Sequence, residues 1–228
     1  MAVHPPLLNE QLALIAVDPD RGRRKLGTAD DLNACLAALL LAELALGGWL
    51  TAGSRSRQVS LTGETPSDPV LAAAAGVVAD RQPKLKAVMS HMSRGLAERL
   101  GTNTWETSVG PWVERGVLAP PGGIIRRHAV VDPGPRDEIV ARLRSLALAD
   151  GSMSPHDALL LSMTGPAGLL EVVAPDRSTR AHARRRIDHA LDDPGLDELA
   201  DVTRAMIREA AAMIATTSVL AAAAVVAD

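Results

Sequence analysis

The sequence predicts a mainly α-helical protein in which a central bundle of apolar helices is accompanied by two small β-hairpins. We expect a single globular domain over residues 1–228, with its core over about residues 7–227. Hydrophobic residues make up 47% of the chain and charged residues 22%, which is the balance of a globular protein rather than a disordered one. The chain has three Trp but no Tyr and no Phe, so aliphatic side chains and Met must build its core. Such side chains suit close helix–helix packing better than wide sheets.

The best-defined helix is predicted over residues 29–46. Thr28 can cap it, and the Gly47-Gly48 pair ends it. Apolar side chains recur at helical spacing along one stripe: Leu32, Cys35, Leu36, Leu39, Leu40 and Leu44. Glu43 lies within this apolar helix, and two interpretations are open. We expect a structural hydrogen bond to backbone or to an Arg, and the alternative is a buried acid with a raised pKa.

Other helices are expected to begin at residues that favour the N-cap position. Asn9, Asp68 and Ser154 are each predicted to cap the helix that follows. Further helices are expected at residues 84–100, 105–116, 136–148, 167–173, 177–191 and 196–227.

Two β-hairpins are predicted between the helices. The first pairs residues 49–52 with residues 58–62 around a Gly-Ser-Arg-Ser-Arg turn. The second, over residues 117–131, has a Pro-Pro-Gly-Gly tip and continues through residues 124–131.

Net charge, cysteine content and hydropathy indicate which partners and which compartment to expect. The net charge of −3 gives no global basic field, so we expect no nucleic-acid partner. The lone Cys35 cannot form an internal disulfide, which favours a reducing, cytoplasmic compartment. Residues 210–227 are almost wholly apolar, but they are mostly Ala with Thr and Ser at the centre, and we expect a core helix rather than a membrane span.

The sequence lacks the common catalytic, nucleotide-binding and metal-binding motifs. There is no Gly-x-Ser-x-Gly elbow, no P-loop, no Gly-x-Gly-x-x-Gly fingerprint and no Cys or acidic ligands at zinc spacing. We therefore expect no enzyme, no cofactor and no metal site.

Two local segments could hold an anion. The first is the basic turn with Arg21, Arg23, Arg24 and Lys25, directly before the N-terminus of the long apolar helix. The second lies in the 117–131 hairpin, where the apolar Ile124 and Ile125 precede Arg126 and Arg127. Apolar tips can enter the headgroup boundary while Arg side chains meet lipid phosphates. The plainer interpretation of both segments is an ordinary exposed turn and hairpin. A basic run at residues 177–186 is expected to be an exposed, salt-bridged helix.

The order of these elements resembles the Golgi phosphoprotein 3 family, whose members bind phosphatidylinositol 4-phosphate. Four stretches carry the likeness: residues 8–18 (LNEQLALIAVD), 36–50 (LAALLLAELALGGWL), 65–71 (TPSDPVL) and 112–118 (WVERGVL). The resemblance covers roughly residues 7–225. It implies a peripheral membrane protein that binds anionic phospholipid, and a homo-oligomer or membrane insertion through the 117–131 hairpin. The alternative is a protein–protein scaffold that keeps the fold without specific lipid binding.

The headgroup pocket of the eukaryotic members is not matched residue by residue. That pocket uses a Trp, an Arg and two further basic residues. The corresponding positions here hold Thr28, Ala37, Thr102 and Trp105. No pocket residue is therefore carried over to this chain.

Overall fold

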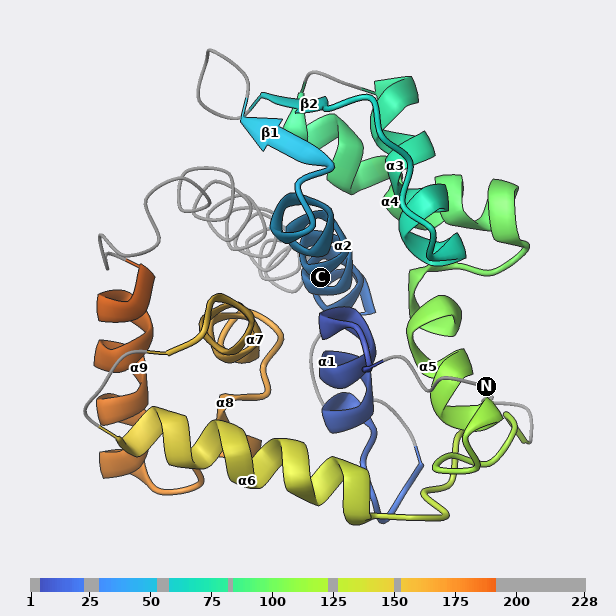
Figure 1. Cartoon of the computed structure of the whole chain (residues 1–228). Coiled ribbons are helices and arrows are strands. Elements are labelled where there is room, and N and C mark those ends of the chain that lie inside the picture. Colours follow the sequence, from blue (N-terminus) through green and yellow to red (C-terminus); the bar gives the residue numbers. More distant parts are fainter. Residues whose placement is uncertain are drawn as a thin grey trace, which may run out of the picture.

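The computed structural model describes residues 5–22, 29–52, 58–81, 84–122, 127–149 and 153–191. It confirms the mainly helical class (Figure 1). The helices are α1 (Leu8–Ala16), α2 (Ala29–Leu46), α3 (Pro69–Arg81), α4 (Leu85–Leu100), α5 (Thr104–Glu114), α6 (Gly134–Leu148), α7 (Pro155–Thr164), α8 (Leu170–Val173) and α9 (Arg177–Leu191). The strands are β1 (Leu50–Ala52) and β2 (Val59–Leu61).

Helix α2 lies at the centre of the structure, in contact with α1, α3, α4, α5, α7 and β1 (Figure 1). The stripe expected from the sequence is buried, but so are residues on other faces of the same helix, such as Ala38, Leu41 and Ala42. A helix that is hydrophobic all round belongs inside a helical core. The single stripe predicted for α2 was therefore too narrow.

The hairpin around residues 50–61 is confirmed as an antiparallel pair, with Leu50 opposite Leu61 and Ala52 opposite Val59. The predicted second hairpin is less regular. Among the described residues it consists of two isolated bridges, Leu118 with Val130 and Gly122 with Arg127. Pro120 and Pro121 separate the two bridges on one side, and proline has no N–H to extend a ladder. We call described residues 117–122 and 127–131 the ribbon.

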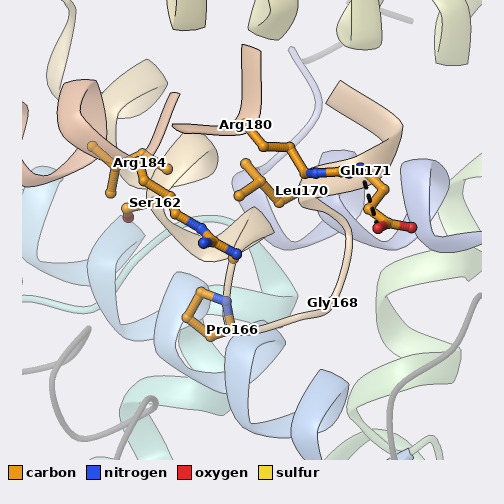
Figure 2. Close-up of a pocket in the computed structure, with 9 residues that line it drawn as sticks. Ser162, Pro166, Gly168, Leu170, Glu171, Arg180 and Arg184 are labelled. Atoms are coloured by element: carbon orange, nitrogen blue, oxygen red, sulfur yellow. Dashed lines mark hydrogen bonds and ion pairs between the residues drawn. The ribbon is translucent and has the colours of Figure 1, made fainter. Parts of the chain in front are cut away.

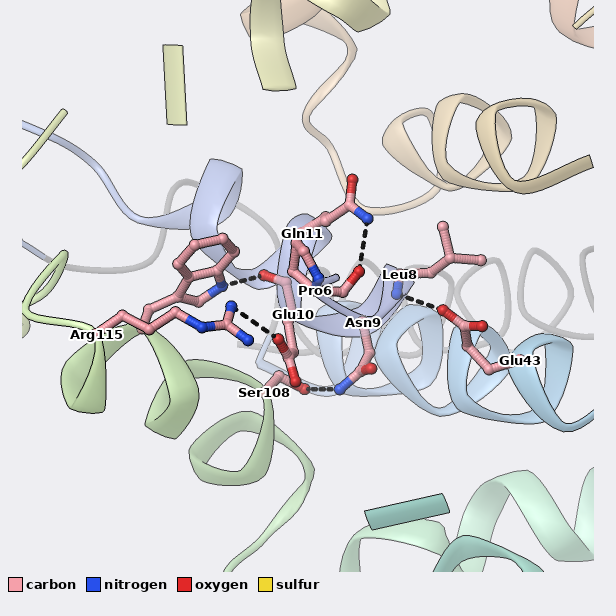
Figure 3. A network of polar contacts seen from close by, with 9 residues as sticks. Pro6, Leu8, Asn9, Glu10, Gln11, Glu43, Ser108 and Arg115 are labelled. Carbon is pink, nitrogen blue, oxygen red and sulfur yellow. Dashed lines mark hydrogen bonds and ion pairs between the residues drawn. The ribbon is translucent and has the colours of Figure 1, made fainter. Parts of the chain in front are cut away.

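Helix α1 is buried at every residue except Gln11, and its first turn must satisfy its backbone N–H groups without water. Its N-cap residue, Leu7, offers no side-chain acceptor. The acceptor comes from α2, where Glu43 Oε1 accepts the Leu8 N–H at 2.7 Å (Figure 3). This contact confirms the structural hydrogen bond expected of Glu43, and burial raises the pKa of its carboxyl.

Helix α5 joins α1 through three polar contacts (Figure 3). The Trp112 Nε1–H donates to the Glu10 backbone oxygen at 2.8 Å, and Asn9 Nδ2 donates to Ser108 Oγ at 2.8 Å. The Arg115 guanidinium lies 4.9 Å from the Trp112 ring centroid and 3.3 Å from Glu10 Oε2. Asn9 is thus a buried residue within α1 that binds α5, and its prediction as an N-cap was wrong.

The Glu43 hydrogen bond predicts how substitutions at this position change the stability of the fold. Replacing Glu43 with Ala leaves a buried N–H without its acceptor and should lower the free energy of unfolding by about 1–3 kcal/mol. Glu43→Gln keeps a side-chain oxygen at the same reach and should lose less. Urea unfolding of both variants measures the difference. Equal losses in the two variants would show that the acceptor itself contributes nothing.

The Glu10 carboxyl predicts a pH dependence. Burial raises the pKa of Glu10 from 4.5 to about 7, although the Arg115 guanidinium lowers it. The folded chain therefore binds this proton more tightly than the unfolded chain, and its contribution to stability is lost as the pH rises from 4.5 through about 7.

The matched variant is Glu10→Gln, which cannot titrate at this position. Its free energy of unfolding relative to the native chain should rise between about pH 5 and about pH 8. Urea unfolding at several pH values measures this difference. A difference that stays constant over that range contradicts a raised pKa at Glu10.

Candidate functional site

The basic turn that follows α1 is organised by one carboxylate. Asp18 Oδ1 accepts the backbone N–H groups of Asp20 at 3.0 Å and Arg21 at 3.1 Å. The Gly22 N–H closes the turn on the Asp18 backbone oxygen at 2.8 Å. Asp is favoured in turns because its side chain can bond its own backbone in this way. The turn leaves the Arg21 side chain exposed.

The turn ends in a contact with the ribbon. The His128 N–H donates to the Gly22 backbone oxygen at 2.8 Å. Gly22 has a φ of +61°, and a Cβ at this position would lie 3.0 Å from the His128 backbone oxygen. Only glycine combines a left-handed backbone with so close an approach. No other amino acid can therefore replace Gly22 at this junction without strain.

His128 also fixes the ribbon internally. Its ring is buried, and Nδ1 donates to the Ala119 backbone oxygen at 3.1 Å. The Ala119 N–H in turn donates to the Ala129 backbone oxygen at 2.8 Å. The side chain and the main chain of one histidine thus tie the two sides of the ribbon to each other and to the turn after α1.

These contacts bring together two segments that the sequence offers as separate candidates. Arg21 precedes Gly22, Arg127 precedes His128, and both arginine side chains are exposed. We call Arg21, Gly22, Arg127 and His128 the basic corner. Val131 follows in the ribbon and is 63% exposed, which adds an apolar side chain to this region.

The remaining predicted site residues lie outside the described part of the chain: Arg23, Arg24, Lys25, Ile124, Ile125 and Arg126. No local sequence signal pairs residue 22 with residue 128, so the joining of the two segments could not be predicted. The sequence feature that comes closest to indicating this pairing is the glycine that follows the charged turn.

Two of the four positions compared with the eukaryotic headgroup pocket lie in the hydrophobic core, namely Ala37 and Trp105. Thr102 shares a hydrogen bond of 2.9 Å with the Thr107 hydroxyl, and Thr28 lies outside the described residues. Side chains buried in the core cannot reach a lipid phosphate. Neither Ala37 nor Trp105 is therefore placed to contact a headgroup.

Among the described residues, no helix is long and apolar enough to cross a bilayer. Within the same ranges, no three His, Cys, Asp or Glu side chains gather closely enough to hold a metal ion. The apolar segment at residues 210–227 lies outside the part of the chain that the structure describes.

The Gly22 contact predicts the effect of a small substitution. Gly22→Ala places a Cβ against the His128 backbone and forces a left-handed alanine, which costs about 1–2 kcal/mol for the backbone alone. The free energy of unfolding should fall by at least this amount. Gly48→Ala is the matched control, because its φ is +77° but nothing lies within 4 Å of its Cβ position. Urea unfolding compares them, and an equal loss in both variants would remove the role of the His128 contact.

No curated protein matches this chain. A family model does match, and its description is Golgi phosphoprotein 3 (GPP34). The match runs over residues 8–224, from the first residue of α1 to beyond the end of α9. This chain therefore belongs to the Golgi phosphoprotein 3 family.

Proposed function

We propose that this chain is a peripheral membrane protein that binds anionic phospholipid headgroups at the basic corner. The observation that carries the proposal is the hydrogen bond from the His128 N–H to the Gly22 oxygen, 2.8 Å long. It joins two segments of the chain that each carry an exposed arginine next to the contact, Arg21 and Arg127. Arginine pairs with phosphate through two parallel N–H groups, which suits a lipid headgroup.

The sequence on both sides of the basic corner favours the same ligand. Residues 18–25 and 124–132 together contain six basic and three acidic side chains. Each basic residue near an anionic membrane contributes about 1 kcal/mol. Ile124 and Ile125, with the exposed Val131, supply apolar side chains for the headgroup boundary. The sum supports weak and reversible binding, which self-association through the ribbon would strengthen.

Phosphatidylinositol 4-phosphate is the candidate lipid on the strength of the family. The buried Ala37 and Trp105 argue against a headgroup pocket like that of the eukaryotic members. We therefore propose that charge density rather than a closed pocket selects the lipid. The same two residues favour a second candidate function, a protein–protein scaffold that has kept the family fold without lipid binding.

We propose a non-enzymatic role. Among the described residues, burial raises the pKa of two carboxyls, Glu10 and Glu43, and both are engaged in contacts that support α1. Such partners suit a structural role better than an acid–base role, because a catalytic carboxyl must face its substrate.

Vesicle co-sedimentation tests the proposal. The native chain should sediment with phosphatidylcholine vesicles that contain phosphatidylserine or phosphatidylinositol 4-phosphate, and not with phosphatidylcholine alone. Arg21→Glu with Arg127→Glu should weaken binding by about tenfold or more, because two favourable charges become repulsive. Ile125→Asp should weaken it further by opposing apolar insertion.

The matched control changes the same charge elsewhere. Lys86 and Arg94 are exposed on α4, so Lys86→Glu with Arg94→Glu alters the net charge equally. This variant should bind within about twofold of the native chain if the basic corner is the site. Equal weakening of both double variants would show that binding depends on net charge alone and not on the basic corner. A native chain that ignores all anionic vesicles would favour the scaffold.

A further inference from the structure

A cavity lies away from the basic corner, between the end of α7, the turn into α8, and α9. Its volume is about 460 Å³. In Figure 1, α6 begins beside the ribbon and ends next to α9, so the length of α6 separates the two places. None of the residues that line the cavity takes part in a contact described above.

The turn between α7 and α8 forms one wall. Gly165 and Pro166 break α7, and Gly168 takes a left-handed φ of 70°. Backbone bonds fix this turn, from the Gly168 N–H to the Gly165 oxygen at 3.0 Å and from the Leu169 N–H to the Thr164 oxygen at 2.7 Å. The two glycines carry no side chain, so the cavity stays open along a fixed backbone.

Helix α9 forms the opposite wall. Arg180, Arg184 and Ile187 follow one another at spacings of four and three residues, which places them on one helical face. Arg180 is already engaged, because Nη1 donates to Glu171 Oε1 at 3.2 Å and to the Pro175 oxygen at 2.8 Å. Its charge is therefore balanced within the wall itself.

Arg184 differs from Arg180 in its surroundings. Figure 2 shows its guanidinium reaching toward Pro166, while Arg180 points the other way to Glu171. None of the described residues forms a hydrogen bond or an ion pair with Arg184. The cavity thus holds a balanced pair and one unbalanced positive charge from the described residues.

The rest of the lining decides which anion fits. Leu170 is buried, Ile187 is half-buried, and both line the cavity together with Pro166. A volume of 460 Å³ lies in the range of small-molecule sites. A bare inorganic ion would leave this apolar lining without a partner.

We propose that this cavity binds a small organic anion, with a phosphate or carboxylate group on Arg184 and a compact apolar body against Leu170, Ile187 and Pro166. The bidentate fork of arginine suits either group. The same phosphate chemistry is found in a soluble metabolite and in a lipid headgroup. The fixed walls and the distance from the basic corner favour the soluble ligand.

Ligand-observed phosphorus NMR with phenyl phosphate tests the proposal on the full chain. The native chain should show saturable binding at millimolar concentration or below, the range expected for a ligand of this size. Arg184→Ala should weaken binding by about tenfold or more, as expected for a charged hydrogen-bond partner. Arg184→Lys should fall between the two, because lysine keeps the charge and loses the fork.

Arg185→Ala is the matched control, since Arg185 is exposed on the same helix and does not line the cavity. It should bind phenyl phosphate within about twofold of the native chain. Circular dichroism checks that each variant keeps its helices. The absence of saturable binding to the native chain, or an equal loss in the Arg184 and Arg185 variants, would overturn the proposal.

Vesicles distinguish the two sources of phosphate. Arg184→Ala should sediment with phosphatidylserine vesicles as the native chain does, and the Arg21 and Arg127 double variant should keep its affinity for phenyl phosphate. Loss of vesicle binding in Arg184→Ala would overturn the assignment to a soluble ligand. The outcome at the cavity is thereby separate from the outcome at the basic corner.

Discussion

The first turn of α1 must satisfy its polar backbone groups inside a core that is almost entirely aliphatic. Its own cap residue provides no acceptor, so Glu43 of α2 accepts the Leu8 N–H. From the other side, Trp112 and Ser108 of α5 bind the Glu10 oxygen and the Asn9 side chain. Two neighbouring helices therefore hold α1 by directional bonds, while apolar packing surrounds it on the remaining faces. Hydrophobic burial alone would not fix the position of α1 along its axis, whereas hydrogen bonds do.

The basic corner is a consequence of that arrangement. Because α5 is bonded to α1, the chain segments that leave the C-termini of these two helices emerge in the same region (Figure 1). One segment becomes the turn at residues 18–22 and the other becomes the ribbon. The Gly22 and His128 contact then joins them at backbone distance. A surface that carries charge from two remote parts of the chain thus depends on how one buried helix is anchored.

Local signals in the sequence predicted much of the fold. The expected caps at Asp68 and Ser154 are present, since the Val70 N–H bonds to Asp68 at 2.9 Å and the Asp157 N–H bonds to Ser154 at 3.1 Å. These interactions span two or three residues, so residue type and spacing suffice to indicate them. Asn9 looks equally suited to capping, but its partner is Ser108, and nothing local reveals a contact 99 residues away. The pairing of residue 22 with residue 128 and the cavity at Arg184 depend on tertiary packing in the same way. The two basic segments themselves were identified from the sequence, and their common location required the structure.

The absence of tyrosine and phenylalanine from this chain has an optical consequence. All near-ultraviolet absorption by aromatic rings, and all intrinsic fluorescence, comes from three tryptophans. Trp105 and Trp112 are both buried on α5, and Trp49 packs against the core beside β1. Two of the three tryptophans therefore report from α5, and the Nε1–H of Trp112 is bonded directly to α1. Separation of α1 from α5 breaks the Trp112 bond to the Glu10 oxygen and changes the surroundings of that indole ring, so a local opening at the anchor of α1 can be followed spectroscopically without any attached probe.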